Sequence, residues 1–228
     1  FRSGTLVNAR WLVATAVIVA SCGSPPPAAA PLLDATSHRM LLLRSFHFKL
    51  QAEGEAQHPP LVQDAEGDVR PPDVFAKADL HQGEVLLEVD LIVVGSAAYL
   101  KSFTGGWQQT SPGQLARYFD VSALFSPDAG LFAALPHTVS PSTGKQSSVS
   151  GHTAYQVSGQ LPADVVHRLL PLAAQAGTYP VQYWIDPATN SLWQASLSGP
   201  LFDASHSSIT FSFSAFDHPV TITPPALG

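Results

Sequence analysis

The chain has 228 residues, with 11 Lys and Arg against 17 Asp and Glu, which gives a formal charge of −6. This acidic balance argues against nucleic acid as a partner, because phosphate binding needs clustered basic side chains. Charged residues are only 12% of the chain, against a usual ~25%, so small and uncharged polar residues must cover much of the surface, as is typical of exported β-rich proteins.

Residues 1–21 have the pattern of an export signal. Arg2 and Arg10 lie before an uncharged apolar run at 11–20 that ends in small residues. A basic segment followed by such a run is typical of signal peptides. At ~1.5 Å per residue the run covers about half of a ~30 Å hydrocarbon core, so it is short for a spanning helix. We expect this segment to be removed on export.

Cys22 is the only cysteine in the chain. Together with Val19, Ala20 and Ser21 it resembles the lipobox of bacterial lipoproteins, in which the cysteine is acylated, for example with palmitate, and becomes the mature N-terminus. An ordinary signal peptide with an incidental cysteine is the alternative. Because two or three acyl chains bind a membrane firmly, Cys22 would anchor the protein at the extracytoplasmic face of the cell membrane, with the Pro- and Ala-rich residues 22–31 as a semi-rigid tether.

Residues 32–225 are expected to form one domain, and its first part is predicted to be mostly strand. A helix is expected at 32–43, where leucines and Met40 can form an apolar stripe. From residue 46 onward, apolar and polar residues alternate, which indicates half-buried strands. Strands are expected at 46–56, 74–81, 83–95 and 97–103, and the Pro- and acid-rich residues 58–73 are interpreted as a long loop or an edge hairpin.

The second part mixes helices and strands. Ser-Pro pairs at 111–112 and 126–127 favour the starts of two short helices. The total of about eight antiparallel strands, with helices inserted between them, predicts an α+β fold with helices over one face of a curved sheet. The expected elements are helices within 105–120 and 121–137, a loop at 141–151, a strand near 152–158, a helix at 161–177, and strands at 181–186, 191–199, 207–217 and 219–223.

No catalytic motif is present. The sequence has no GxSxG, HExxH, CxxC, GxGxxG or Walker pattern, and its nine histidines never stand at the HxH or HxxxH spacing of metal ligands. For His38 and His167 a solvated or hydrogen-bonded side chain is the preferred interpretation. We therefore predict that the protein is not an enzyme and has no cofactor and no metal site.

Several motifs, in their order and spacing, carry a family resemblance over residues 33–224. They resemble the LppX/LprA/LprF/LprG lipoproteins of mycobacterial cell envelopes, and an architecture similar to that of the LolA/LolB carriers is expected. The motifs are Trp107-Gln108 with Ser111-Pro112, Phe119-Asp120-Val121-Ser122, Phe125 to Leu131, Gly151 to Tyr155 leading into Val157-Ser158-Gly159, an LPAxxV helix start, and the closing PVxxWID, LxGP and FSxFDxPVxIxxP stretches.

The resemblance implies a strongly curved antiparallel sheet, a half-barrel, with helices over its concave face enclosing an apolar cavity. It also implies a carrier that binds acyl lipids or lipoglycans there and moves or presents them in the envelope. A lipid leaves a bilayer only if its methylenes reach another apolar site, at ~25 cal/mol per Å² buried. The expected cavity residues are Leu87, Val89, Leu91, Val93, Leu124, Leu131, Leu135, Val166, Leu169 and Leu170.

Other interpretations stay open at this stage. A tethered structural or sensing module would have a filled core with few voids larger than a water molecule. An accessory protein of a membrane lipid transporter is a further alternative, and it is compatible with direct lipid carriage. An enzyme would need a polar cluster with perturbed ionisation in a cleft, and the sequence offers no such cluster.

Overall fold

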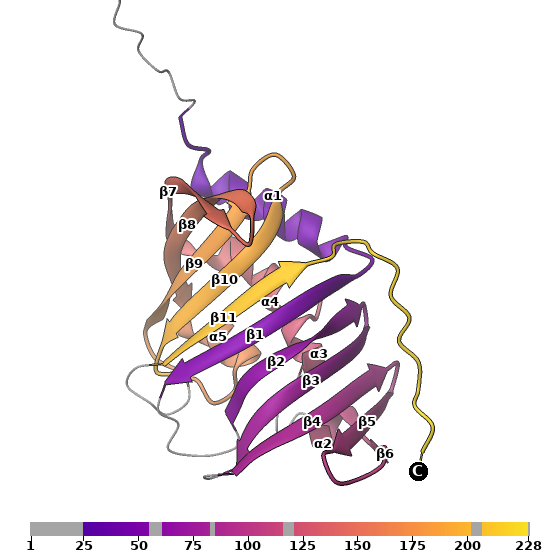
Figure 1. Ribbon diagram of the computed structural model, residues 1–228. Helices are drawn as coiled ribbons and strands as arrows, with labels where there is room; N and C mark the ends of the chain where they lie inside the picture. The colour runs from indigo at the N-terminus through magenta and orange to yellow at the C-terminus, as the bar shows by residue number, and fades with distance from the viewer. Residues whose placement is uncertain (1–24, 55–60, 83–84, 116–120, 202–206, 228) are drawn as a thin grey trace, which may run out of the picture.

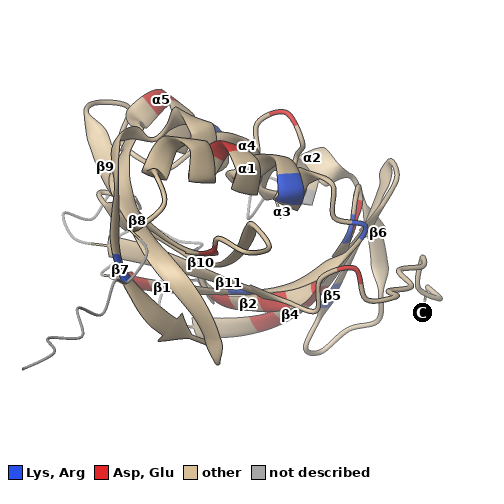
Figure 2. Ribbon diagram, turned by 90° about the horizontal axis from the view of Figure 1, so that it is seen from above, with Lys and Arg blue, Asp and Glu red and all other residues tan. Residues whose placement is uncertain are grey.

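The computed structural model describes residues 25–54, 61–82, 85–115, 121–201 and 207–227. In this part of the chain, eleven antiparallel strands form one sheet in the order β6-β5-β4-β3-β2-β1-β11-β10-β9-β8-β7. The sheet is strongly curved, and the helices lie across its concave side (Figure 1 and Figure 2).

The elements follow one another with short connections. The strands are β1 (Phe46–Gly54), β2 (Leu61–Arg70), β3 (Asp73–Gln82), β4 (Val85–Val94), β5 (Ala97–Ser102), β6 (Gln108–Thr110), β7 (Val139–Val149), β8 (His152–Pro162), β9 (Thr178–Asp186), β10 (Ser191–Gly199) and β11 (Ser207–Ser214). The helices are α1 (Ala29–Leu41), α2 (Pro112–Leu115), α3 (Val121–Leu124), α4 (Leu131–Ala134), the 3₁₀ turn η1 (Leu135–His137) and α5 (Ala163–Leu169).

The pairing of β1 with β11 joins the two halves of the sheet. Phe48 lies opposite Phe213, and Leu50 lies opposite Phe211, and all four side chains are buried. Successive side chains of a strand point to opposite faces, so these apolar residues face the helices and the polar residues between them face outward. The alternation of apolar and polar residues in the sequence therefore decides which side chains lie on the concave face and which on the convex face.

Helix α1 covers part of the concave side with one apolar face. Its buried residues recur at three- and four-residue spacing, as expected of an amphipathic helix. The helix contacts α4, η1, β7 and β10. The buried positions are Ala29, Leu32, Leu33, Thr36, Ser37 and Met40.

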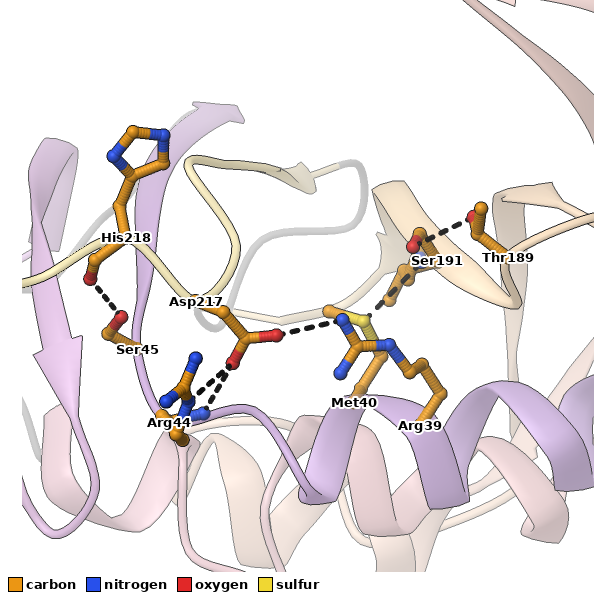
Figure 3. A network of polar contacts seen from close by, with 9 residues as sticks. Arg39, Met40, Arg44, Ser45, Thr189, Ser191, Asp217 and His218 are labelled. Atoms are coloured by element: carbon orange, nitrogen blue, oxygen red, sulfur yellow. Dashed lines mark hydrogen bonds and ion pairs between the residues drawn. The ribbon is translucent and has the colours of Figure 1, made fainter.

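Polar contacts fasten the end of α1 to the segment after β11 (Figure 3). The Arg39 guanidinium donates to one carboxylate oxygen of Asp217 at 3.0 Å, and the backbone N–H of Arg44 donates to the other at 2.9 Å. The Ser45 hydroxyl donates to the backbone carbonyl of His218. The Arg44 N–H, followed by the Arg39 guanidinium, holds the pKa of Asp217 below its usual range.

The predicted fold class is confirmed, but the interpretation of residues 58–73 as a loop or edge hairpin is wrong for residues 61–70, and 58–60 lie outside the described residues. β2 occupies 61–70 and lies in the sheet between β1 and β3. Its buried residues include Val62, Ala65 and Val69, and a register shift between Val62 and Asp64 breaks the regular alternation. Small residues and this irregularity hide the strand from a pattern search.

Other predicted boundaries also differ from the structure. Residues 141–151, expected as a loop, belong mostly to β7, an edge strand without apolar alternation. The helix expected at 161–177 is limited to α5, because residue 161 and Pro162 end β8. In the described residues no strand forms at 219–223, and the sheet has eleven strands rather than about eight. α1 begins at Ala29, so the last residues of the expected tether are helical.

Among the described residues, no helix combines the length and apolar character needed to cross a membrane. Cys22 and the predicted signal segment 1–21 lie outside the described residues.

Candidate apolar binding site

An aromatic cluster fills the centre of the space between the sheet and the helices. Phe46 of β1 contacts Phe125 and Phe132 edge-on, with ring centroids 5.2 and 5.3 Å apart. Phe213 of β11 lies 5.2 Å from Phe132, and Phe48 lies 4.9 Å from Phe125. The segment after α3 is thus held against the sheet by ring contacts, each of which adds about 0.5–1.5 kcal/mol beyond area burial.

A small apolar cavity lies beside this cluster, beneath α4 and α5. Its volume is about 20 Å³, enough for about one water molecule, so the helices rest almost directly on the sheet. Its walls come from three helical segments and four strands. They are Leu124, Leu131, Leu161, Leu169, Leu170, Val181, Ala195, Ser196, Leu197 and Phe211.

A larger apolar pocket opens on the other side of Phe125, between α3 and the β2–β3 hairpin. Its volume is about 470 Å³. Leu124 lines the small cavity and the next residue, Phe125, lines the large pocket, so the two spaces approach each other at this point of the chain. The lining residues of the larger pocket are Val69, Pro71, Pro72, Val74, Ser122, Phe125, Ser126 and Pro127.

The expected cavity residues fall into three groups. Leu124, Leu131, Leu169 and Leu170 line the small cavity. Leu135 and Val166 are fully buried nearby in the same apolar core. The third group is on β4, which three strands separate from β11, and it lines neither apolar space. Val89, Leu91 and Val93 are buried there, whereas Leu87 is 39% exposed.

One buried polar pair lies in the otherwise apolar core. The phenol of Tyr183 and the hydroxyl of Thr138 are 3.1 Å apart, and Thr138 also donates to the backbone carbonyl of Leu135 at 2.8 Å. Burial raises the pKa of Tyr183 far above its usual value, so its phenol stays neutral at physiological pH. The pair satisfies its own hydrogen bonds and offers no reactive group.

The chemistry of this region is that of an apolar binding site. In the described part of the chain, no three His, Cys, Asp or Glu side chains gather as a possible metal site. His167, one of the histidines considered from the sequence, contacts the backbone carbonyl of Ala173 and the side chain of Gln175. The arrangement can therefore enclose apolar groups, and it holds no cluster suited to acid–base chemistry.

The larger pocket was missed by sequence reasoning. Val69, Pro71 and Pro72 come from the segment 58–73 that was interpreted as a loop or an edge hairpin, and Val74 stands at the start of the strand expected at 74–81. The two prolines carry no alternation that would mark them as a wall. Phe125-Ser126-Pro127 was available as a signal, because it is one of the motifs that carry the family resemblance.

Comparison with known proteins places the chain in a family. Residues 28–222 match the family described as LppX_LprAFG lipoprotein. The chain belongs to this family.

Its curated relatives are carriers or transporters by name. The chain is 28% identical to a "Lipoarabinomannan carrier protein LprG" of Mycolicibacterium smegmatis, over 94% of this chain and 93% of the relative. It is 24% identical to a "Putative diacylated glycolipid transporter LprF" of Mycobacterium tuberculosis, over 90% of this chain and 81% of the relative. These names agree with the expectation that the protein is not an enzyme.

Solved structures support the fold. The crystal structure of LprF from Mycobacterium bovis matches with a TM-score of 0.74 at 22% identity, covering 90% of this chain and 100% of that one. The structure of the Mycobacterium tuberculosis lipoprotein LppX matches with a TM-score of 0.63 at 20% identity, covering 85% and 97%. The half-barrel is therefore the fold of the family.

Proposed function

We propose that this protein binds acyl lipids or lipoglycans between its sheet and its helices, and that it carries or presents them in the cell envelope. The observation that carries the proposal is the pair of apolar spaces lined by the adjacent residues Leu124 and Phe125. The names of the relatives, lipoarabinomannan carrier and glycolipid transporter, support the same class of ligand.

The proposal requires the helices to move away from the sheet. Pockets for ligands of drug size have volumes of roughly 300–1,000 Å³, and the larger pocket, at about 470 Å³, lies in that range. The smaller cavity, at about 20 Å³, does not. A displacement of Leu124 and Phe125 would join the two spaces and lengthen the site for an acyl chain.

The helices that would move are well suited to do so. α3 and α4 have four residues each, and helices this short are marginal without tertiary packing. Their apolar contacts with the sheet could be replaced by contacts with acyl methylenes at little net cost, because burial of apolar surface is non-directional.

The proposal includes the anchor. Acylated Cys22 would hold the protein at the extracytoplasmic face of the cell membrane, after removal of 1–21, with the residues from 22 up to the start of α1 as tether. A membrane lipid transporter that donates or accepts the lipid is the partner we propose for such a carrier.

The test is lipid capture by the chain from residue 23 onward, which keeps the whole of α1 and lacks the acylation site. The protein is purified from a lipid-containing host, weighed by native mass spectrometry, and extracted for lipid mass spectrometry. A reproducible acyl-lipid adduct is expected for the wild-type sequence. Leu131→Trp, which fills the small cavity, should lose it, and Leu42→Trp, at an exposed position, should keep it.

One result would overturn the proposal. If several hosts yield only the bare protein mass, and the protein takes up neither added phospholipid nor triacylglycerol, then the core is a packed interior and the protein is a tethered structural or sensing domain.

A further inference from the structure

The convex face of the sheet is divided into a charged half and an uncharged half. Strand register brings outward-facing residues into rows that cross most of the sheet. On β1–β5 these rows consist largely of Lys, Asp and Glu, and Figure 2 shows charged residues along this part of the sheet. The first row reads, in spatial order from β8 to β5, Gln156, Trp184, Gln194, Ser212, Lys49, Glu66, Lys77, Asp90 and Lys101.

The next row repeats the division. Its β8–β11 members are amide or hydroxyl side chains, and its β2–β4 members are all acidic. The row reads Ser158, Gln182, Ser196, Thr210, Gln51, Asp64, Asp79 and Glu88. Asp186, which is charged and lies at the end of β9, is engaged with Ala188 and Thr189 in the turn that follows.

A groove of about 510 Å³ lies where the uncharged half reaches the strand ends. Its walls carry hydroxyl groups, one carboxylate and no basic side chain. Glu53 is exposed, and among the described residues neither its carboxylate nor the hydroxyls of Ser198 and Ser208 have a hydrogen-bond partner. The lining residues are Glu53, Gly54, Pro180, Ser198, Gly199, Ser207 and Ser208.

This set of groups fits a neutral polyol. Sugar hydroxyls both donate and accept, as do the amides and hydroxyls of the two rows. A carboxylate accepts from hydroxyl groups in charge-assisted bonds, which are the stronger class. The half-buried indole of Trp184 offers an apolar face with a polar tip. An anionic ligand would instead meet Glu53 and no compensating Lys or Arg in the groove.

The groove and the small apolar cavity lie on opposite sides of the same strand ends. Val181 and Leu197 line the cavity, and their neighbours Pro180 and Ser198 line the groove. Since consecutive side chains of a strand point to opposite faces about 3.3 Å apart along the chain, an amphiphile could keep its acyl chains inside and turn its head group around the strand end. The two parts of one such molecule would then lie on opposite faces of the same strands.

We propose that the uncharged convex face of β8–β11, together with this groove, binds the neutral glycan of a lipoglycan whose acyl chains lie between the sheet and the helices. This inference rests on the proposed function for the acyl part. The glycan surface itself is independent of the cavity and can be tested with a sugar that has no acyl chain.

The experiment is a titration of the isotope-labelled chain from residue 23 onward with an acyl-free neutral oligomannoside, followed by amide chemical shifts. Chemical-shift changes are expected for the amides of those residues of β9, β10 and β11 whose side chains lie on the convex face. Glu53→Gln and Trp184→Ser should each weaken binding about tenfold, which corresponds to the loss of one strong hydrogen bond or packing contact. Lys77→Gln, on the charged half of the same face, is the matched control and should leave binding unchanged.

The failure of this inference is distinguishable from that of the proposed function. If the protein captures an acyl lipid but the oligomannoside shifts no convex-face amide, the glycan surface is refuted and the apolar site stands. If the oligomannoside binds as expected but no acyl adduct forms, the lipid-carrier proposal is refuted and the glycan surface stands. If Glu53→Gln and Lys77→Gln weaken binding equally, the groove is also refuted. Because Glu53 is exposed, the Glu53→Gln variant should fold.

Discussion

Replacing Gly130 with alanine should displace the α3–α4 turn that forms the cover of the apolar site. Gly130 precedes α4 and has φ −77° and ψ −176°, a backbone conformation that alanine adopts freely. A Cβ added there would lie 2.4 Å from the carbonyl oxygen of Ser126 and 2.7 Å from that of Leu124. Any effect of the substitution therefore arises from lack of space, because no backbone strain is involved.

The size of the effect follows from what the new methyl group meets. The obstructing atoms belong to the backbone, and the Gly130 N–H already donates to the Ser126 carbonyl at 2.9 Å, so no side chain can rotate away. Overpacking of this kind costs about 1–3 kcal/mol. For a domain of this size, a loss of 2 kcal/mol lowers Tm by roughly 4–8 °C.

The assay is thermal and urea unfolding of wild type, Gly130→Ala and a control, Gly113→Ala. Gly113 lies in α2, and a Cβ there would meet nothing within 4 Å, so the control should be unchanged or slightly more stable, since alanine favours helix over glycine. If Gly130→Ala unfolds at the wild-type temperature, or if both variants lose stability equally, the steric reasoning is wrong.

Three further predictions concern the core and its polar contacts. Asp217→Asn removes the ion pair with Arg39 and should lower the free energy of unfolding by about 1 kcal/mol at pH 7. Because the pKa of Asp217 is lowered in the folded state, this contribution is complete above about pH 4 and falls as the pH drops further. A loss of stability in urea unfolding that is equal at pH 7 and pH 2.5 would contradict this prediction. Tyr183→Phe should cost about 1 kcal/mol by leaving Thr138 with one hydrogen bond fewer. Since burial raises the pKa of Tyr183, spectrophotometric titration near pH 10 should count the same number of ionising phenols in the folded wild type and in the folded variant; one phenol more in the wild type would count against the burial argument. Phe46→Ala should cost about 3–5 kcal/mol by opening a cavity at the centre of the aromatic cluster, measurable as a lower urea midpoint, and a loss under 1 kcal/mol would mean that the cluster repacks.

Strands with regular alternation could be predicted from the sequence alone. In β1 and β11, Phe46, Phe48, Phe211 and Phe213 recur at every second position, and this spacing by itself determines that they share one face. The half-barrel, in contrast, was implied by the family resemblance of the motifs and not by this alternation. A helix was also predicted at 32–43, where α1 spans Ala29–Leu41.

Strands without alternation could not be predicted in this way. β7 is rich in Ser and Thr and is an edge strand whose residues are mostly exposed, so burial imposes no pattern on it. β2 carries a register shift and small buried residues such as Ala65 and Gly67. A Cβ at Gly67 would meet the Phe75 backbone, a close approach that depends on the neighbouring strand and leaves no trace in hydropathy.

The candidate site, too, was predicted from the sequence only in part. The sequence by itself predicted that Leu124, Leu131, Leu169 and Leu170 are apolar positions of helices, because local spacing decides which face of an element is buried. Only the tertiary structure decided that these four meet around one cavity while Leu87, Val89, Leu91 and Val93 on β4 do not, since that depends on the curvature of the sheet and on where the helices cross it. The division of the convex face is likewise a property of register between strands far apart in the chain, and no local pattern contains it.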